Sequence, residues 1–139
     1  MIVPVVFYHG LARWGVKRQF AETVVAVPEL QAYVPNCVYH LIDLNACRDE
    51  ELRGAVMLQV ALLTLKYVFR AELRERLPGI LGLLQELEEN SSGLDFIRSW
   101  LRYLAQMVET DRLSEADLHQ AVTRALRGGG ELMMTVAEQ

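Results

Sequence analysis

Two short apolar runs are the only convincing strand-like segments in this chain, and the pattern after them is helical. Residues 3–8 read Val-Pro-Val-Val-Phe-Tyr, and residues 38–44 read Val-Tyr-His-Leu-Ile-Asp-Leu. Runs of β-branched and aromatic residues of this length are typical of buried strands. Two strands alone are marginal in water, because a stable sheet needs further strands or a covering helix. This shortage of strands constrains the fold more than any other feature.

The segment between the two runs favours a parallel arrangement of the strands. Residues 9–37 are too many for a tight hairpin and enough for a crossover connection. A short helix is predicted within them, because Pro28 suits the first turn of a helix and Pro35 stops it. We therefore expect the two strands to be parallel.

About four helices are predicted after residue 48. The first begins with three carboxylates, Asp49 to Glu51, which favour the positive end of a helix, and it is apolar on nearly all sides between residues 54 and 65. Pro78 is expected to open the second, which stops at the turn cluster of residues 90–93. Ser114 is the predicted cap of the fourth. The predicted spans are residues 49–69, 78–89, 94–108 and 115–126.

These elements predict an α+β fold that is mostly helical and forms one compact unit. Residues 1–48 are expected to supply the strand-crossover-strand part, and residues 49–127 a helical region packed on it. Residues 128–139 follow the Gly128 to Gly130 helix stop and are expected to form a loosely ordered tail.

Composition and charge exclude several classes of protein. The chain of 139 residues is 52% hydrophobic and 23% charged, which excludes a disordered tail and a disulfide scaffold. Fourteen basic against eighteen acidic side chains give a net charge of −4, so no global positive field attracts nucleic acid or anionic lipid. No signal-peptide pattern follows Met1, and the apolar stretch between Arg53 and Lys66 is too short to span a bilayer. We expect a cytoplasmic protein without a membrane partner, its Cys37 and Cys47 reduced.

No catalytic residue, metal ligand or cofactor is predicted from motifs. Cys37 and His40 are three apart along a strand and would point to opposite faces, which does not suit a zinc site. The serines lack a nucleophile-elbow motif. The segment Glu29-Leu30-Gln31 has the Glu-x-Gln form found in metal-dependent nucleases, but it follows Pro28 in a helical context.

The best local candidates for binding follow the first strand. Tyr8 and His9 lie at the carboxyl end of a predicted parallel strand, where open α/β sheets place their ligands. Basic groups at Arg13, Lys17 and Arg18 come soon after. An alternative is a turn in which the aromatic and imidazole groups pack and hydrogen-bond locally.

A second combination of cations and aromatic residues occurs at Arg98, Trp100 and Arg102. Residues 49–139 carry ten basic and fifteen acidic side chains, a balance that would repel a duplex. We therefore expect Arg98 and Arg102 to form the solvated face of their helix.

Four segments carry a resemblance to a known family. They are Pro4 to Gly10 followed by Trp14, Leu41 to Leu44, Asp49 to Leu52, and Met133 to Gln139. In this order they resemble the recombination-promoting nuclease family, whose members are also described as YhgA-like putative transposases. The match spans nearly the whole chain, and Tyr8-His9-Gly10 is its most specific part.

The resemblance implies a restriction-endonuclease-like α/β fold for the parent protein, with magnesium-dependent DNA cleavage linked to recombination. In that family the acidic metal ligands lie upstream of the matched segment, so no catalytic residue carries over to this chain. The resemblance would also explain the strand shortage, because it places the missing strands in front of Met1. On this reading the chain is a C-terminal fragment, non-catalytic alone, that reaches DNA through the missing upstream region.

Two other interpretations remain. The chain is alternatively an interaction or homo-oligomerisation module in which the edge of Val3 to Tyr8 pairs with a partner strand. A third interpretation is a small intact enzyme that uses Tyr8 and His9, for which the sequence suggests no substrate.

Overall fold

The computed structural model describes residues 2–89, 91–108 and 113–137. The sequence predicts one compact unit, whereas the chain divides into two, residues 1–47 and residues 48–139, which we call unit 1 and unit 2. Unit 1 holds the two strands and unit 2 holds all the α-helices. The mostly helical α+β class expected from the sequence is confirmed.

Unit 1 is built on a two-stranded parallel sheet. Strand β1 (Val5–Tyr8) pairs with β2 (His40–Asp43) in a register that runs from Val5 opposite His40 to Tyr8 opposite Asp43. Pro4 stands just before β1, where its missing N–H costs no ladder bond, and its carbonyl accepts from the His40 N–H at 2.9 Å. Both predicted strands and their parallel direction are therefore confirmed.

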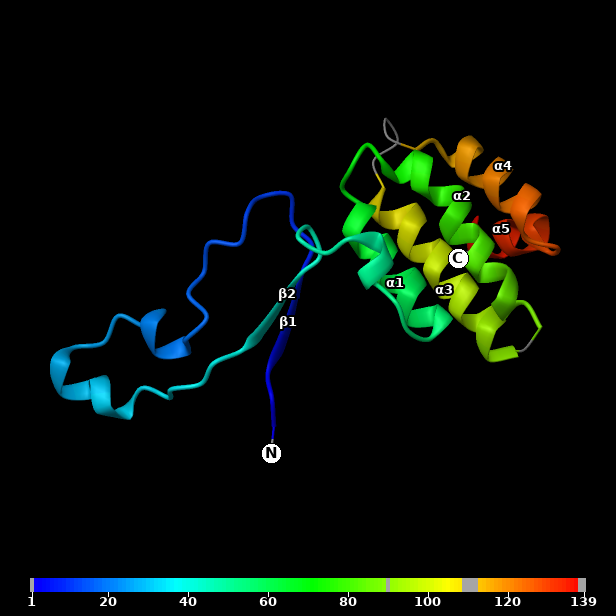
Figure 1. Ribbon diagram of the computed structural model, residues 1–139. Helices are drawn as coiled ribbons and strands as arrows, with labels where there is room; N and C mark the ends of the chain where they lie inside the picture. The colour runs from blue at the N-terminus through cyan, green and yellow to red at the C-terminus, as the bar shows by residue number, and fades with distance from the viewer. Residues whose placement is uncertain (1, 90, 109–112, 138–139) are drawn as a thin grey trace. The chain divides into compact units, whose positions relative to one another are not determined.

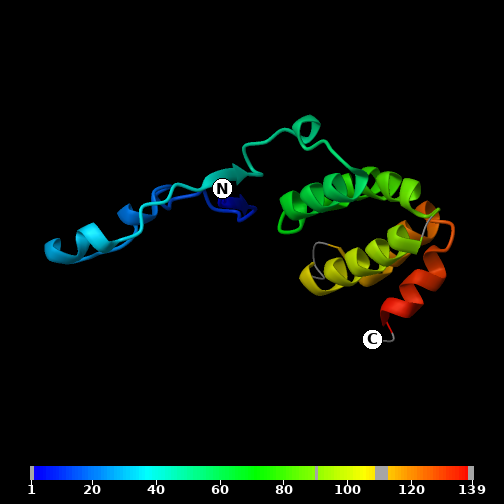
Figure 2. The same cartoon turned by 90° about the horizontal axis from the view of Figure 1, so that it is seen from below.

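The connection between the strands forms two extended runs that carry two short 3₁₀ helices, η1 (Phe20–Glu22) and η2 (Pro28–Tyr33) (Figures 1 and 2). Pro28 occupies the first turn of η2, as its sequence context predicts. The two runs are tied together at an antiparallel bridge between Gln19 and Val38. The Phe20 N–H donates there to the Cys37 carbonyl at 2.9 Å.

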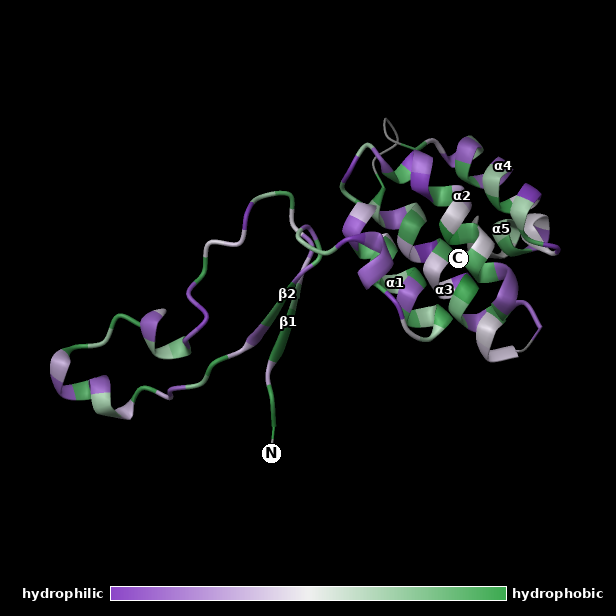
Figure 3. Ribbon diagram, in the orientation of Figure 1, coloured by the Kyte–Doolittle hydropathy of each residue, from purple (hydrophilic) through white to green (hydrophobic). Residues whose placement is uncertain are grey.

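Unit 1 leaves most of its apolar side chains exposed. Of the large apolar residues that the structure describes as exposed, thirteen belong to unit 1 and three to unit 2. Val5 and Phe7 of β1 are 46% and 47% exposed. Figure 3 shows β1 as hydrophobic along most of its length. A pair of strands with this surface lacks the burial that stabilises a sheet.

Unit 2 begins with a 3₁₀ turn, η3 (Asp49–Glu51), which is separate from the first helix, α1 (Val56–Tyr67). The sequence predicts one helix from Asp49 to Phe69, and the structure corrects this. Gly54 stands between the two elements with φ of +149°, a conformation that L residues rarely adopt and that interrupts the helix.

The second helix, α2 (Leu73–Leu84), begins a full turn earlier than predicted, so Pro78 lies inside it. An internal proline forfeits a backbone hydrogen bond and disfavours the preceding turn. Leu73 and Leu77 offset this cost, because they lie in that turn and are only 1% and 2% exposed. Tertiary burial therefore decides where this helix starts.

The residues predicted as a turn after α2 instead start a helix. The short η4 (Gln85–Leu87) follows α2, and α3 (Ser91–Met107) begins at Ser91; Asn90 of the predicted cluster lies outside the described residues. Glycine at position 93 lets the first turn of α3 lie against the end of η4, because a Cβ there would lie 1.9 Å from the Leu87 carbonyl oxygen.

The last two helices are α4 (Glu115–Ala125) and α5 (Gly129–Ala137). Ser114 caps α4 as predicted, with its Oγ accepting from the Asp117 N–H at 3.1 Å. The residues expected to form a loose tail instead form α5, since Leu132 and Met133 are each buried to 6% exposure. Glu138 and Gln139 of the family-like C-terminal segment lie outside the described residues.

The core of unit 2 lies among its helices. The packed pairs include α1 with α2, α2 with α4, and α3 with α5. A buried hydrogen bond from Trp100 Nε1 to Thr64 Oγ1, 2.7 Å long, joins α3 to α1. Among the described residues, no helix has both the length and the apolar character needed to cross a bilayer.

Candidate functional site

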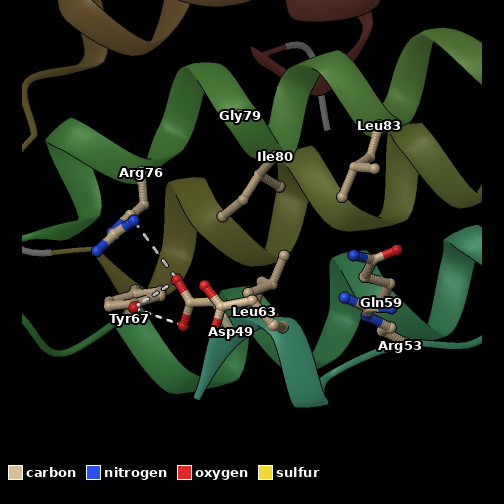
Figure 4. A pocket seen from close by; sticks show the side chains of 10 residues that line it. Asp49, Arg53, Gln59, Leu63, Tyr67, Arg76, Gly79, Ile80 and Leu83 are labelled. Carbon is tan, nitrogen blue, oxygen red and sulfur yellow. Dashed lines mark hydrogen bonds and ion pairs between the residues drawn. The ribbon is translucent and has the colours of Figure 1, made fainter.

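The most organised group of charged side chains in the described part of the chain surrounds Asp49 in unit 2. Its Oδ1 accepts from Lys66 Nζ at 2.5 Å, and the Tyr67 hydroxyl lies 2.7 and 2.9 Å from its two oxygens. An Arg76 guanidinium nitrogen stands 3.6 Å from Oδ2. One carboxylate thus joins η3 to the end of α1 and the start of α2 (Figure 4). We call these four residues the Asp49 cluster.

Burial makes the ion pair between Asp49 and Lys66 different from the surface pairs. The Lys66 side chain is 8% exposed and that of Asp49 is 25% exposed. By contrast, Arg98 and Asp95 on α3 are 45% and 74% exposed. A charge held away from water must be paired to be tolerated, so each partner depends on the other.

The Asp49 cluster shifts the pKa values of its members. Burial is the largest influence on the pKa of Asp49 and acts to raise it, but the hydrogen bonds and charges of Lys66, Tyr67 and Arg76 together hold that pKa below its usual value. Burial likewise acts to lower the pKa of Lys66, and Asp49 overcomes it, so the pKa is raised. Burial and the hydrogen bond to Asp49 raise the pKa of Tyr67. The lysine and carboxylate are therefore held charged and the phenol neutral at pH 7.

Two cations also face the Tyr67 ring. Lys66 Nζ lies 5.2 Å from the ring centroid, and Arg76 Cζ lies 5.5 Å from it. These distances allow cation–π attraction. The aromatic ring therefore helps to hold both positive groups beside the carboxylate.

A pocket of about 370 Å³ opens beside the Asp49 cluster. Apolar side chains on α1 and α2 and charged groups on the η3 side line it together (Figure 4). Its lining residues are Asp49, Glu50, Arg53, Gln59, Leu63, Tyr67, Arg76, Gly79, Ile80 and Leu83.

The chemistry available to Asp49 is restricted by its partners. A carboxylate of lowered pKa that already accepts from Lys66 and Tyr67 is a weak general base. It also does not fit a magnesium site, because two cations already compensate its charge. The Asp49 cluster is therefore a structural clamp for unit 2.

The residues predicted as binding candidates lie in unit 1, apart from the Asp49 cluster in the sequence. Tyr8 ends β1, and its hydroxyl donates to the Ala12 carbonyl at 2.6 Å. The Tyr8 ring also contacts the Trp14 ring edge-on, with centroids 4.9 Å apart. His9 follows Tyr8 at the carboxyl end of β1, half-buried. Arg13, Lys17 and Arg18 are exposed on the loop that follows.

The other residues weighed in the sequence take structural positions. Trp100 is 5% exposed in the core, whereas Arg98 lies on the surface and pairs with Asp95 at 3.0 Å. Cys37 is exposed, and Cys47 Sγ donates to the Asp43 carbonyl at 3.4 Å. Within the described ranges, no group of three or more His, Cys, Asp or Glu residues is arranged to hold a metal ion.

Sequence reasoning missed the Asp49 cluster. It treats Asp49 as a helix-start carboxylate and does not pair it with Lys66, seventeen residues later. The available signal was the position of Lys66 at the end of a long apolar stretch, since buried lysines are almost always paired.

Comparisons with known proteins support the resemblance seen in the sequence. The family model described as "Putative transposase, YhgA-like" matches residues 1–95. Recombination-promoting nuclease RpnC of Escherichia coli (strain K12) is 26% identical over 138 residues, which cover 99% of this chain and 44% of that protein. The chain thus spans less than half the length of this relative. No solved structure matches the chain significantly.

Replacement of Asp49 by asparagine should destabilise unit 2, because it removes the carboxylate charge that pairs with the buried Lys66. We expect the free energy of unfolding to fall by about 3 kcal/mol, measured by urea denaturation with far-UV circular dichroism. Adding Lys66→Met should restore part of the loss. The matched control is Asp95→Asn, which removes an exposed pair and should cost less than about 0.5 kcal/mol. Equal losses of unfolding free energy in Asp49→Asn and Asp95→Asn would contradict the structural role of the Asp49 cluster.

The Asp49 cluster should also make stability depend on pH in a defined direction. Because the pKa of Asp49 is lowered from 3.8 on folding, its contribution is complete above that value and is lost as the pH falls through the lower folded pKa. The pKa of Lys66 is raised from 10.5, so its contribution is lost only as the pH rises above that value. The stability difference between wild type and Asp49→Asn should therefore shrink below about pH 4. A difference that stays constant from pH 7 to pH 2 would count against this assignment.

Proposed function

The chain belongs to the YhgA-like putative transposase family, and on that premise we propose that it is a non-catalytic part of the DNA-processing machinery of this family. In this proposal it completes its sheet with strands from outside residues 1–139. The relative RpnC is named a recombination-promoting nuclease, and DNA is accordingly the polymer on which we propose the complete assembly acts.

The exposed apolar surface of the β1–β2 pair carries the proposal. Parallel strands are normally buried on both faces, with neighbours along their edges. Here Val5 and Phe7 in β1 and Val38 beside β2 are 46%, 47% and 63% exposed. More than half of RpnC has no counterpart in this chain, so a longer family member has ample sequence for the additional strands.

The state of Asp49 supports a non-catalytic role. Metal-dependent nucleases hold magnesium through carboxylates that are free to coordinate it. The Asp49 carboxylate is instead compensated by Lys66 and Arg76. We propose that the magnesium ligands of the complete assembly lie outside residues 1–139.

The free edge of β1 favours a second candidate function, a protein-interaction or homodimerisation module. Exposed edge strands are usually protected by charges, prolines or bulges. The four residues of β1 carry no charge, and among the described residues the strand pairs only with β2. A second copy or another partner strand could pair with the open side.

The purified chain should not cleave DNA. We expect supercoiled plasmid to remain intact with magnesium or manganese, because the proposal places the metal-binding carboxylates elsewhere. Gel electrophoresis of the plasmid measures this, with the E. coli relative as a parallel reaction in the same buffers. Magnesium-dependent nicking that co-elutes with the chain through two different columns, and that stops with a chelator, would overturn the non-catalytic role.

Self-association should depend on the exposed face of β1. Phe7→Lys places a charge on this face and should suppress association in light scattering, whereas the control Leu58→Lys should not. The two residues are matched in exposure at 47% and 49%. Open-ended association of the wild type supports the incomplete sheet. A discrete dimer whose Val5–Tyr8 amides resist hydrogen exchange supports the module instead. A wild-type monomer with rapidly exchanging β1 amides would contradict the module.

A further inference from the structure

The loop that follows β1 concentrates positive charge in an acidic chain. Arg13, Lys17 and Arg18 fall within six positions, and no Asp or Glu occurs from residue 9 to residue 21. Residues 49–139, in contrast, carry ten basic and fifteen acidic side chains. We call residues 9–19 the basic loop. Its local charge is therefore opposite in sign to that of the rest of the chain.

The backbone of the basic loop is held in place by Tyr39, which precedes β2. The Tyr39 hydroxyl donates to the Lys17 carbonyl at 2.8 Å and accepts from Trp14 Nε1 at 3.2 Å. The Tyr39 N–H donates to the Arg18 carbonyl at 3.3 Å. The main chain of Lys17 and Arg18, near the end of the loop, is thus fixed.

The beginning of the basic loop is fixed as well. Asn45 Nδ2 donates to the Gly10 carbonyl at 2.8 Å, and Tyr8 bonds to the Ala12 carbonyl. Gly10 leaves room for the Tyr8 side chain, because a Cβ at position 10 would lie 2.5 Å from the Tyr8 hydroxyl oxygen. The loop is therefore built to present its side chains from a defined backbone, which lowers the entropy lost on binding.

The cations of the basic loop form no ion pair within the described part of the chain. Arg13, Lys17 and Arg18 are exposed, and none of them forms an ion pair with another described residue. Asp43 lies opposite Tyr8 in the strand register. Its carboxylate accepts from the Asn45 N–H at 3.0 Å and is not paired with a cation of the basic loop. Three exposed cations on a fixed backbone, with no ion pair to any described residue, form a site for a polyanion.

We propose that the basic loop binds the phosphate backbone of DNA. From Arg13 to Arg18 the chain reaches at most about 17 Å, which spans several phosphates of one strand. Arginine and lysine contacts of this kind position a protein on DNA and do not read its sequence. Trp14 is already engaged by Tyr8 and Tyr39, so the loop binds by charge and not by base stacking. This assignment rests on the proposed function, since it names where the chain touches the polymer.

Binding of a fluorescently labelled 20-base-pair duplex to the full chain tests the proposal. The variant Arg13→Gln/Lys17→Gln/Arg18→Gln should lose at least tenfold in affinity at low salt, measured by fluorescence anisotropy. The slope of log affinity against log salt should fall by about 2 to 3, because each lost phosphate contact removes close to one unit. A second duplex of unrelated sequence should bind equally well.

The matched control removes the same charge from unit 2. Arg53, Arg124 and Arg127 are also exposed and form no ion pair with a described residue. The variant Arg53→Gln/Arg124→Gln/Arg127→Gln should change the affinity by less than about threefold if binding is local to the basic loop. Far-UV circular dichroism checks that both variants remain folded.

A separate variant tests the anchoring of the basic loop. Tyr39→Phe keeps all three cations but removes the hydroxyl that holds Trp14 and Lys17. We expect a loss of affinity with little change in the salt slope. Unchanged affinity in this variant would overturn the role given to the anchor.

Two results would overturn the assignment of the DNA contact. One is equal weakening by the two triple variants, which would indicate a general charge effect. The other is no binding of the wild-type chain even at low salt. Neither result bears on the plasmid-cleavage test. Cleavage of plasmid by the chain would overturn the non-catalytic role but not the DNA contact.

Discussion

Apolar parallel strands need to be covered on both faces. The fold of this chain depends on this requirement more than on any other. β1 and β2 satisfy each other's backbone along one edge, but Val5 and Phe7 remain about half exposed. Each large apolar side chain left in water forgoes roughly 1 to 2 kcal/mol of burial. A pair with this surface gains stability when further strands or a partner cover it, which is why we propose that the chain belongs to a larger assembly. The family match and the greater length of RpnC support that proposal.

Unit 2 meets the same demand internally. Its helices bury a leucine-rich core that includes Leu81, Leu84 and Leu101, each at most 1% exposed. The Asp49 cluster then attaches η3 to this core by one buried ion pair. Such a pair contributes little net stability but makes any other placement of the turn costly, because each charge would be stranded without its partner. The Asp49 carboxylate thus has a structural role.

The two units differ in the sign and the pairing of their charges. Unit 2 is acidic and pairs the buried Lys66 with Asp49, whereas the basic loop of unit 1 presents cations that form no ion pair with a described residue. A chain of negative net charge can still contact DNA through a local group of cations, because salt screens exposed charges that are more than about 8 to 10 Å apart. Tyr39 is central to this arrangement, since its hydroxyl group accepts from Trp14 Nε1 and donates to the Lys17 carbonyl.

The sequence by itself determined the features that depend on neighbouring residues: the two strands, the Pro28 turn and the Ser114 cap, because alternation, ring geometry and capping act within a few residues. It also marked the basic residues of the loop. Only the tertiary structure decided that Pro78 lies inside α2, that Gly93 lies in the first turn of α3 and that Asp49 pairs with Lys66. These outcomes depend on burial and on contacts between residues distant in the chain, which local preference does not encode.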